Sequence, residues 1–235
     1  MLRKLALALL ASTWFVSAHA AECQDSVFPL RLTNADNVLQ ENFGTAILLD
    51  RERWLYLAPA HVVTHADRIF IIRLVELRVV FIDPENNIAL LEPKDPAVMK
   101  FWIGLLDRDI TALTLAPETP AAGEVLVCSY PLKSLTAERA RIVSAADIQP
   151  SALDKRGFMR IDKEIFPGES GGAVLDSEHR LVGMVVTLLT QTRELVNPGV
   201  AIPVEKLQQA VTRATEPRLE MGPPAPPHLT PAAAP

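Results

Sequence analysis

The sequence predicts an all-β domain, and three observations support this fold class. Short apolar runs rich in Val, Ile and Leu recur along the middle of the 235-residue chain. Turn clusters such as PENN, PETPAAG and VNPG separate these runs, and helical periodicity is scarce. About ten to twelve short strands at this spacing are typical of a β-sandwich or of β-barrels.

The predicted strands follow one another at short intervals. GTAILLD and WLYLAPA flank the polar turn RER, and together they predict a β-hairpin over residues 44–60. Residues 68–83, RIFIIRLVELRVVFID, are rich in β-branched side chains and are predicted to be extended. The remaining strand-like runs are DITALTLA, EVLVCSY, ARIVSA, GFMRID, GAVLD, RLVGMVVTLL and GVAIP.

One helix is predicted, near the end of this region. Pro203 is suited to the first turn of a helix because its φ is already fixed near the helical value. In the following stretch, VEKLQQAVTRA, the spacing of Val204, Leu207 and Val211 places these three side chains on one face. The pattern predicts an amphipathic helix that packs against the β domain.

The two ends of the chain differ from the domain in composition. Residues 1–20 combine a basic start, a short apolar run and the small-x-small pattern of SAHA, which predicts a cleaved export signal. The apolar run is too short for a membrane anchor, since spanning a bilayer takes about 20 residues. Residues 216–235 are rich in Pro and Ala and predict an extended tail. We therefore expect a domain over residues 21–215 that is periplasmic or extracellular.

Charge and cysteine content limit the function classes. The net charge is −5, and no basic stripe or aromatic platform occurs, which argues against nucleic-acid binding. Outside the export signal no apolar run is long enough to span a membrane. Cys23 and Cys128 would meet an oxidising compartment after export, so they are either a disulfide or two buried thiols. A bridge would close a long loop and stabilise the fold by about 4–5 kcal/mol.

The stretch FPGESGGAVLD, residues 166–176, predicts a nucleophile. Glycines around Ser170 allow the backbone to approach a substrate carbonyl and to aim N–H groups at one point. An acyl-transfer enzyme needs such donors for the oxyanion, and the N–H groups of Gly168 and Ser170 are the candidates. The serine hydroxyl also needs a base. Away from the two ends of the chain, the histidines available are His61, His65 and His179.

The segment before His61 selects this histidine by resemblance. Leu57-Ala58-Pro59-Ala60-His61 is similar to the histidine segment of trypsin-like (chymotrypsin-fold) serine proteases, and the resemblance is closest to the HtrA/Deg branch. It covers about residues 40–210 and continues in order through further segments. These segments are FIDPENNIALLEPK, ARIVSA, IDKEIFPGESGGAVLD and GVAIPVEKL.

This resemblance carries a set of expectations. It implies two six-stranded antiparallel β-barrels with the active site between them, followed by a C-terminal helix. It implies that Ser170 is the nucleophile, that His61 is the general base, and that polypeptides are the substrates. No metal or organic cofactor is implied. The HtrA/Deg branch usually continues into a PDZ domain, and we expect this chain to lack one.

Asn87 departs from the family pattern. The family places an aspartate before Ile-Ala-Leu-Leu, where it accepts the Nδ1–H of the histidine and stabilises the imidazolium. An asparagine is neutral and can donate to Nδ1, which leaves the proton on the wrong nitrogen. In a trypsin-like protease this change lowers kcat by about 10⁴, or roughly 5.4 kcal/mol. Three interpretations follow: an attenuated protease, rescue by Asp83 or Glu85, or an inactive homologue that binds peptides or proteins.

Other departures concern the loop and the specificity pocket. Glu169 stands directly before the serine, and we interpret it as a locally paired carboxylate that braces the loop. By the family pattern Glu164 lies at the pocket floor, where it would select a basic side chain, although surface exposure is the alternative. Leu188 would narrow one pocket wall, whereas Gly199 would leave the opposite wall open. The branch favours small aliphatic side chains, so these signals conflict.

Two other motifs point to different chemistry. GESGG also satisfies the G-x-S-x-G pattern of α/β-hydrolases, but that fold needs a strand–turn–helix around the serine, and a strand-like run follows here. His61 and His65 have the spacing of a zinc helix, but the glutamate of H-E-x-x-H and a third ligand are missing. We therefore expect no metal site and interpret His65 as a surface residue.

Overall fold

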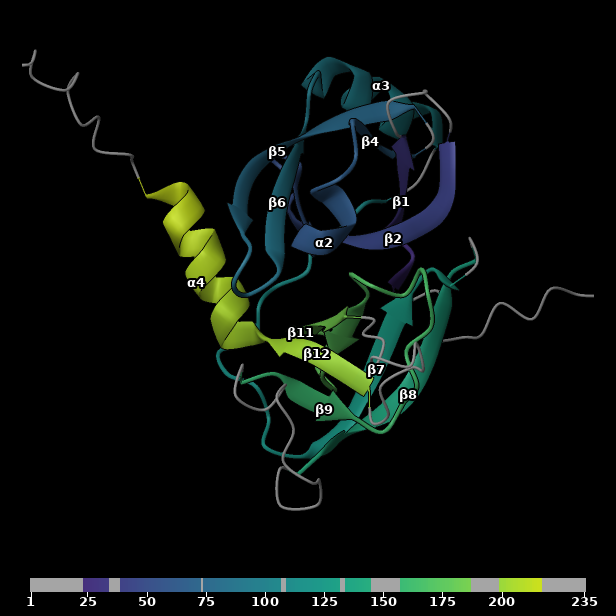
Figure 1. Cartoon of the computed structure of the whole chain (residues 1–235). Coiled ribbons are helices and arrows are strands. Elements are labelled where there is room, and N and C mark those ends of the chain that lie inside the picture. Colours follow the sequence, from purple (N-terminus) through teal and green to yellow (C-terminus); the bar gives the residue numbers. More distant parts are fainter. Residues whose placement is uncertain are drawn as a thin grey trace, which may run out of the picture.

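The computed structural model consists of two stacked β-barrels with a helix along one side (Figure 1). Each barrel is closed, has six strands and pairs its strands antiparallel, which confirms the predicted fold class. The structure describes residues 23–33, 39–72, 74–106, 109–131, 134–144, 157–186 and 199–216, without the side chains of residues 39–43 and 106.

Three expectations fall wholly or almost wholly outside these described residues. They are the export signal over residues 1–20, the tail over residues 216–235, of which only the first residue is described, and the pocket wall at Leu188. Within the described part of the chain, no helix is long and apolar enough to cross a membrane.

The first barrel is formed by strands in the spatial order β1-β2-β3-β6-β5-β4, and it closes where β1 pairs with β4. The predicted hairpin is confirmed as β2 and β3, whereas residues 68–83 divide into two paired strands, β4 and β5. The strands are β1 (Val27–Thr33), β2 (Leu39–Asp50), β3 (Leu55–Pro59), β4 (Arg68–Ile71), β5 (Val75–Asp83) and β6 (Ile88–Pro93).

The second barrel has the spatial order β10-β11-β12-β9-β8-β7 and closes where β10 pairs with β7. Its core is aliphatic and includes the fully buried Val127, Ile161 and Val185. The strands are β7 (Gly123–Ser129), β8 (Thr136–Val143), β9 (Met159–Ile161), β10 (Ala173–Leu175), β11 (Leu181–Val186) and β12 (Gly199–Pro203).

The helices include the predicted one and two that the sequence interpretation missed. Helix α4 (Val204–Thr215) follows β12 directly, buries Val204 and Leu207, and extends beside β5 and β6 of the first barrel (Figure 1). Helix α2 (Ala60–Val63) is a single turn after β3. Helix α3 (Pro96–Leu106) is apolar on its exposed face as well as its buried one, so its sequence lacks the amphipathic pattern.

The connection between the barrels is extended but is not a regular strand, contrary to the prediction for DITALTLA. Thr111 and Leu113 donate their N–H groups to the first barrel, at the carbonyls of Asp25 and Leu48. A single bridge then pairs Leu115 with Leu181 of the second barrel. The backbone hydrogen bonds of this segment are therefore divided between the two barrels. This explains why the segment does not pair continuously with any one strand.

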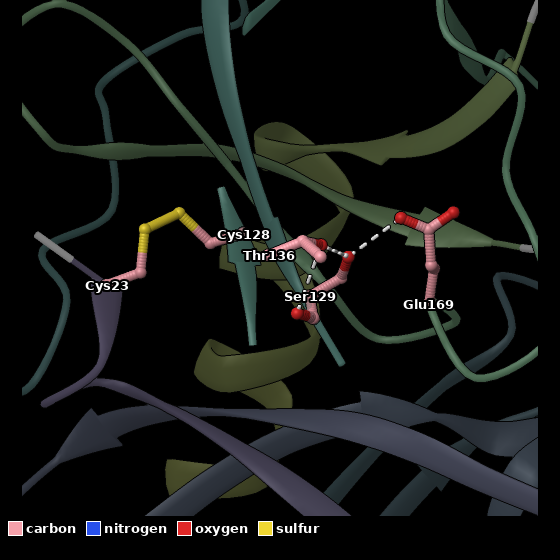
Figure 2. The surroundings of a disulfide bond; sticks show 5 residues. All are labelled: Cys23, Cys128, Ser129, Thr136 and Glu169. Carbon is pink, nitrogen blue, oxygen red and sulfur yellow. Dashed lines mark hydrogen bonds between the residues drawn. A yellow bond between two sulfur atoms is a disulfide. The ribbon is translucent and has the colours of Figure 1, made fainter. Parts of the chain in front are cut away.

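A disulfide also joins the barrels. It links Cys23, just before β1, to Cys128 on β7, with the Cα atoms 6.1 Å apart and both residues fully buried. Figure 2 shows that the next residue on β7, Ser129, points toward Glu169 in the loop before β10. The bridge thus ties the start of the domain to the strand that supports this loop.

Candidate active site

The candidate active site brings together side chains from the two barrels. His61 lies in α2, immediately after β3 of the first barrel, and Ser170 lies in the turn before β10 of the second. The Oγ of Ser170 is 3.3 Å from the Nε2 of His61, although the residues are 109 positions apart. A hydroxyl and an imidazole nitrogen at this distance can exchange a proton once a substrate tightens the contact.

Asn87 occupies the far side of the imidazole. It lies in the turn between β5 and β6 and has a φ of 60°, a left-handed conformation that asparagine tolerates better than most residues. Its carbonyl accepts the N–H of Ala60 at 3.0 Å, and its Oδ1 accepts the backbone N–H of His61 at 2.9 Å. The backbone and the side chain of Asn87 therefore both hold the turn that carries the histidine.

The amide of Asn87 offers His61 two alternative hydrogen bonds. The Nδ1 of His61 lies 3.0 Å from Oδ1 and 2.9 Å from Nδ2. Flipping the amide would turn Nδ2 against the backbone N–H of His61, so the present orientation is favoured. Nδ2 can then donate to an unprotonated Nδ1, or Nδ1–H can donate to Oδ1. A carboxylate would accept from Nδ1–H in every case, so the amide loses tautomer control.

The electrostatic setting of His61 reflects the missing carboxylate. Although solvent reaches His61, its ring is partly buried, and this burial lowers the pKa of His61 below its usual value. The hydrogen bond with Asn87 acts to raise the pKa but offsets the effect of burial only in part. In the described part of the chain the ring contacts Asn87 and Ser170 and meets no carboxylate. An imidazolium at this position would therefore have no carboxylate beside it among the described residues.

Asp83 does not supply that charge. Its carboxylate accepts two hydrogen bonds from Asn86, at 3.1 and 2.8 Å, and pairs with Arg213 of α4 at 3.4 Å. Burial opposes ionisation, but the bonds from Asn86 and the charge of Arg213 hold the pKa of Asp83 below its usual range. The interpretation of Asp83 as a substitute acid is therefore corrected: it braces the turn that presents Asn87.

The loop before Ser170 has two glycines in the left-handed region and a tight turn at the serine. Gly168 and Gly171 have φ values of 95° and 93°, where a side chain would be strained. The carbonyl of Glu169 accepts the N–H of Gly172 at 2.8 Å. Because the N–H of a trans peptide points opposite to its carbonyl, this bond directs the Ser170 N–H to the other side of the loop.

Thr45 of β2 fixes the same loop from the first barrel, and the sequence interpretation missed it. Its hydroxyl donates to the carbonyl of Gly168 at 3.1 Å, and its N–H donates to the carbonyl of Ser170 at 2.7 Å. The same hydroxyl accepts the N–H of Tyr130. One fully buried threonine thus holds both residues proposed as oxyanion donors. Only contacts between distant segments reveal this role.

The two predicted specificity residues that the structure describes, Glu164 and Gly199, do not line a pocket. Glu164 is exposed, in agreement with the surface alternative. A side chain at Gly199 would collide with the carbonyl of Lys163 and with Ile165. The idea that Gly199 leaves a pocket wall open is therefore wrong, and the glycine allows close backbone packing instead, with its N–H donating to Lys163 at 3.0 Å.

Comparisons with known proteins agree with this architecture. A family model for the trypsin-like peptidase domain matches residues 44–184. A structure of the HtrA-type protease AlgW with a tripeptide has a TM-score of 0.63 and 22% identity, covering 85% of this chain and 64% of that one. A variant of AlgW with a tripeptide has a TM-score of 0.64, 22% identity and coverages of 85% and 63%. The chain thus spans less than two thirds of these AlgW chains. No curated protein matches it.

Proposed function

Because the chain belongs to the trypsin-like peptidase domain family, we propose that it is an exported serine endopeptidase whose turnover is slowed by Asn87. The observation that carries this proposal is the 3.3 Å contact between the Ser170 hydroxyl and the His61 imidazole across the two barrels. Polypeptides are the proposed substrates. Export is supported by the buried disulfide, since such bridges persist in oxidising compartments.

The proposed reaction follows from the roles of three groups. The Oγ of Ser170 attacks the peptide carbonyl and its proton passes to the Nε2 of His61, while the N–H groups of Gly168 and Ser170 receive the oxyanion. The imidazolium then returns the proton to the leaving amine, and the acyl-enzyme is hydrolysed by water through the same steps. Acylation and hydrolysis of the acyl-enzyme each begin with Nε2 free of a proton, because Nε2 must first accept one from the attacking hydroxyl or water.

Asn87 slows this cycle in two ways. Its Nδ2 stabilises the tautomer with the proton on Nε2, which cannot accept the serine proton. In the productive tautomer its Oδ1 offers the imidazolium an amide dipole rather than a full negative charge. Asn87 does not alter the proposed oxyanion donors, and an oxyanion hole together with substrate binding retains about 10³–10⁴-fold catalysis over water in trypsin-like enzymes.

A fluorophosphonate probe tests this proposal, because it phosphonylates a serine only when a base and an oxyanion site activate it. We expect slow labelling of the wild type, no labelling of Ser170→Ala, and at least about 10²-fold slower labelling of His61→Ala. His65→Ala is the matched control, since His65 is an exposed histidine in the same region. Absence of wild-type labelling at raised pH, where His61 is neutral, would refute the proposal.

A second candidate function is peptide binding without turnover. It is favoured by the amide orientation at Asn87, in which Oδ1 holds the backbone of His61 and Nδ2 faces the ring. A cleft between barrels could then hold an extended peptide by strand addition. A peptide library bound to the wild type and recovered uncleaved, from a protein that the probe does not label, would support this candidate.

A further inference from the structure

The residue directly before the nucleophile is a fully buried carboxylate. Glu169 lies between the two residues proposed as oxyanion donors and exposes no surface. Its Oε2 accepts the N–H of Phe166 at 2.7 Å, and its Oε1 accepts the hydroxyl of Ser129 at 2.9 Å (Figure 2). Its own N–H donates to the carbonyl of Phe166 at 3.1 Å. The side chain and the backbone of Glu169 thus close one tight turn around Gly168.

A lysine neutralises this carboxylate. The Nζ of Lys163 lies 2.9 Å from the Oε1 of Glu169, and the lysine side chain is only 9% exposed. The same ammonium contacts the carboxylate of Glu138 on β8 at 3.2 Å and the carbonyl of Glu164 at 3.3 Å. Glu138 is half exposed, so solvent weakens its hold on the ammonium. The pair with Glu169 is the desolvated one, and there loss of the partner charge is most costly.

The ion pair connects the loop before Ser170 to strands of the second barrel. Lys163 lies two residues beyond the end of β9, and its carbonyl accepts the N–H of Gly199 at the start of β12. Ser129 ends β7 next to the disulfide. Glu169 is therefore held by Ser129 at the end of β7 and by Lys163 just after β9, while Thr45 holds the neighbouring carbonyls from the first barrel. A shift of the Glu169 carboxylate would pull on Phe166 and move the Gly168 peptide.

The geometry points to Lys163 as a positioning residue of the active site: its ammonium keeps the buried Glu169 in place, and Glu169 in turn sets the loop that presents the Gly168 and Ser170 N–H groups. This inference rests on the proposed function and adds to it a residue that touches no reacting atom.

The test compares Lys163→Met with the double variant Lys163→Met/Glu169→Gln. Methionine keeps the length of the lysine stem without its charge, and glutamine keeps an oxygen for the Phe166 N–H and an N–H for Ser129. Lys94→Met is the matched control, because Lys94 pairs with Glu76 at 2.6 Å on the surface of the first barrel. Fluorophosphonate labelling gives kinact and KI, and amide hydrogen exchange reports the order of residues 165–172.

A positioning role makes specific demands on these measurements. Removing one oxyanion donor costs about 10²–10³ in rate, so displacing the loop should lower kinact of Lys163→Met about 10- to 100-fold, with KI changed less than about threefold. Exchange should rise in residues 165–172. The double variant should recover most of kinact, and Lys94→Met should match the wild type.

The outcomes separate this inference from the proposed function. If the wild type is labelled and folded Lys163→Met keeps its kinact and exchange rates, the inference is overturned and the proposed function stands. If Lys163→Met does not fold, the double variant decides, and a folded double variant without recovered kinact overturns the inference. If the wild type is never labelled, the proposed function fails. The inference about the loop is then tested by amide hydrogen exchange in Lys163→Met, or in the double variant if Lys163→Met does not fold. Faster exchange confined to residues 165–172 supports the loop role of Lys163, and unchanged exchange overturns it.

Discussion

Restoring a carboxylate at Asn87 should accelerate acylation of Ser170 by about three orders of magnitude. In Asn87→Asp one oxygen keeps the bond to the backbone N–H of His61, and the second replaces the Nδ2 that lies 2.9 Å from Nδ1. The second oxygen can only accept a hydrogen bond, so the neutral ring must carry its proton on Nδ1. The Nε2 that faces Ser170 is then free to act as the base.

The magnitude follows from the charge that forms in the transition state. A carboxylate and an imidazolium whose charges lie about 4 Å apart attract by about 4 kcal/mol at an effective dielectric constant near 20. At 1.36 kcal/mol per decade this corresponds to about 10³ in rate. The loss of about 10⁴ seen for the opposite change in a trypsin-like protease sets the upper end.

The assay is the rate of fluorophosphonate labelling across pH, with Asn87→Asp/Ser170→Ala as the background control. The new carboxylate should also raise the pKa of His61, so the acid limb of the rate profile should move to higher pH than in the wild type. A labelled wild type with an Asn87→Asp rate within about threefold of it would refute the reasoning, since electrostatic support of His61 by a carboxylate should matter far more. Another group would then have to orient the imidazole.

Three further predictions concern the acid range, a glycine and the disulfide. Because burial lowers the pKa of His61, its neutral form persists as the pH falls below about 6.5, so wild-type labelling should be half-maximal below that pH in a stopped-time pH series. A half-maximal point above pH 6.5 would contradict this. Gly199→Ala places a methyl group against the carbonyl of Lys163 and should lower the free energy of unfolding by about 1–3 kcal/mol. Urea titration measures this change, and an unchanged midpoint would contradict the packing argument. Replacing Cys23 and Cys128 by Ser opens a loop with a sequence separation of 105 and should lower the same quantity by about 4.7 kcal/mol, whereas a loss under about 1 kcal/mol would mean that other contacts join the barrels.

The strands could be predicted because each signal was local. Alternating or continuous apolar runs between turn clusters located the paired strands, and an amphipathic face located α4. Helix α3 escaped prediction because Phe101 and Leu105 are exposed, so its apolar residues surround the axis. The apolar run over residues 109–116 predicted a strand, but the backbone partners of this segment lie in two different barrels. No local pattern separates that case from a ladder.

The residues of the candidate site also fall into those that a local motif identifies and those that it does not. His61, Asn87 and Ser170 stand in short motifs, so the sequence could name them and could identify the missing charge. The partners of the loop have no such motif. Thr45 reaches Gly168 across 123 positions and Tyr130 across 85, and each contact exists only after both barrels have closed.

This division bears on the choice between an attenuated enzyme and a binding protein. A cleft that only holds peptides needs no ordered donors for an oxyanion, and a buried ion pair beside it would add little, since apolar residues of similar volume are often as stable. Here Glu169 is fully buried and satisfied by Lys163, Ser129 and Phe166, and its hydrogen bond with Phe166 closes the turn around Gly168. The loop that carries the proposed oxyanion donors is therefore fully braced, and the departure that would slow catalysis lies behind the imidazole. That combination favours a slow protease over a homologue without activity. The Lys163 variants test the ordering of the loop, and the Asn87 variant tests the effect of the missing charge.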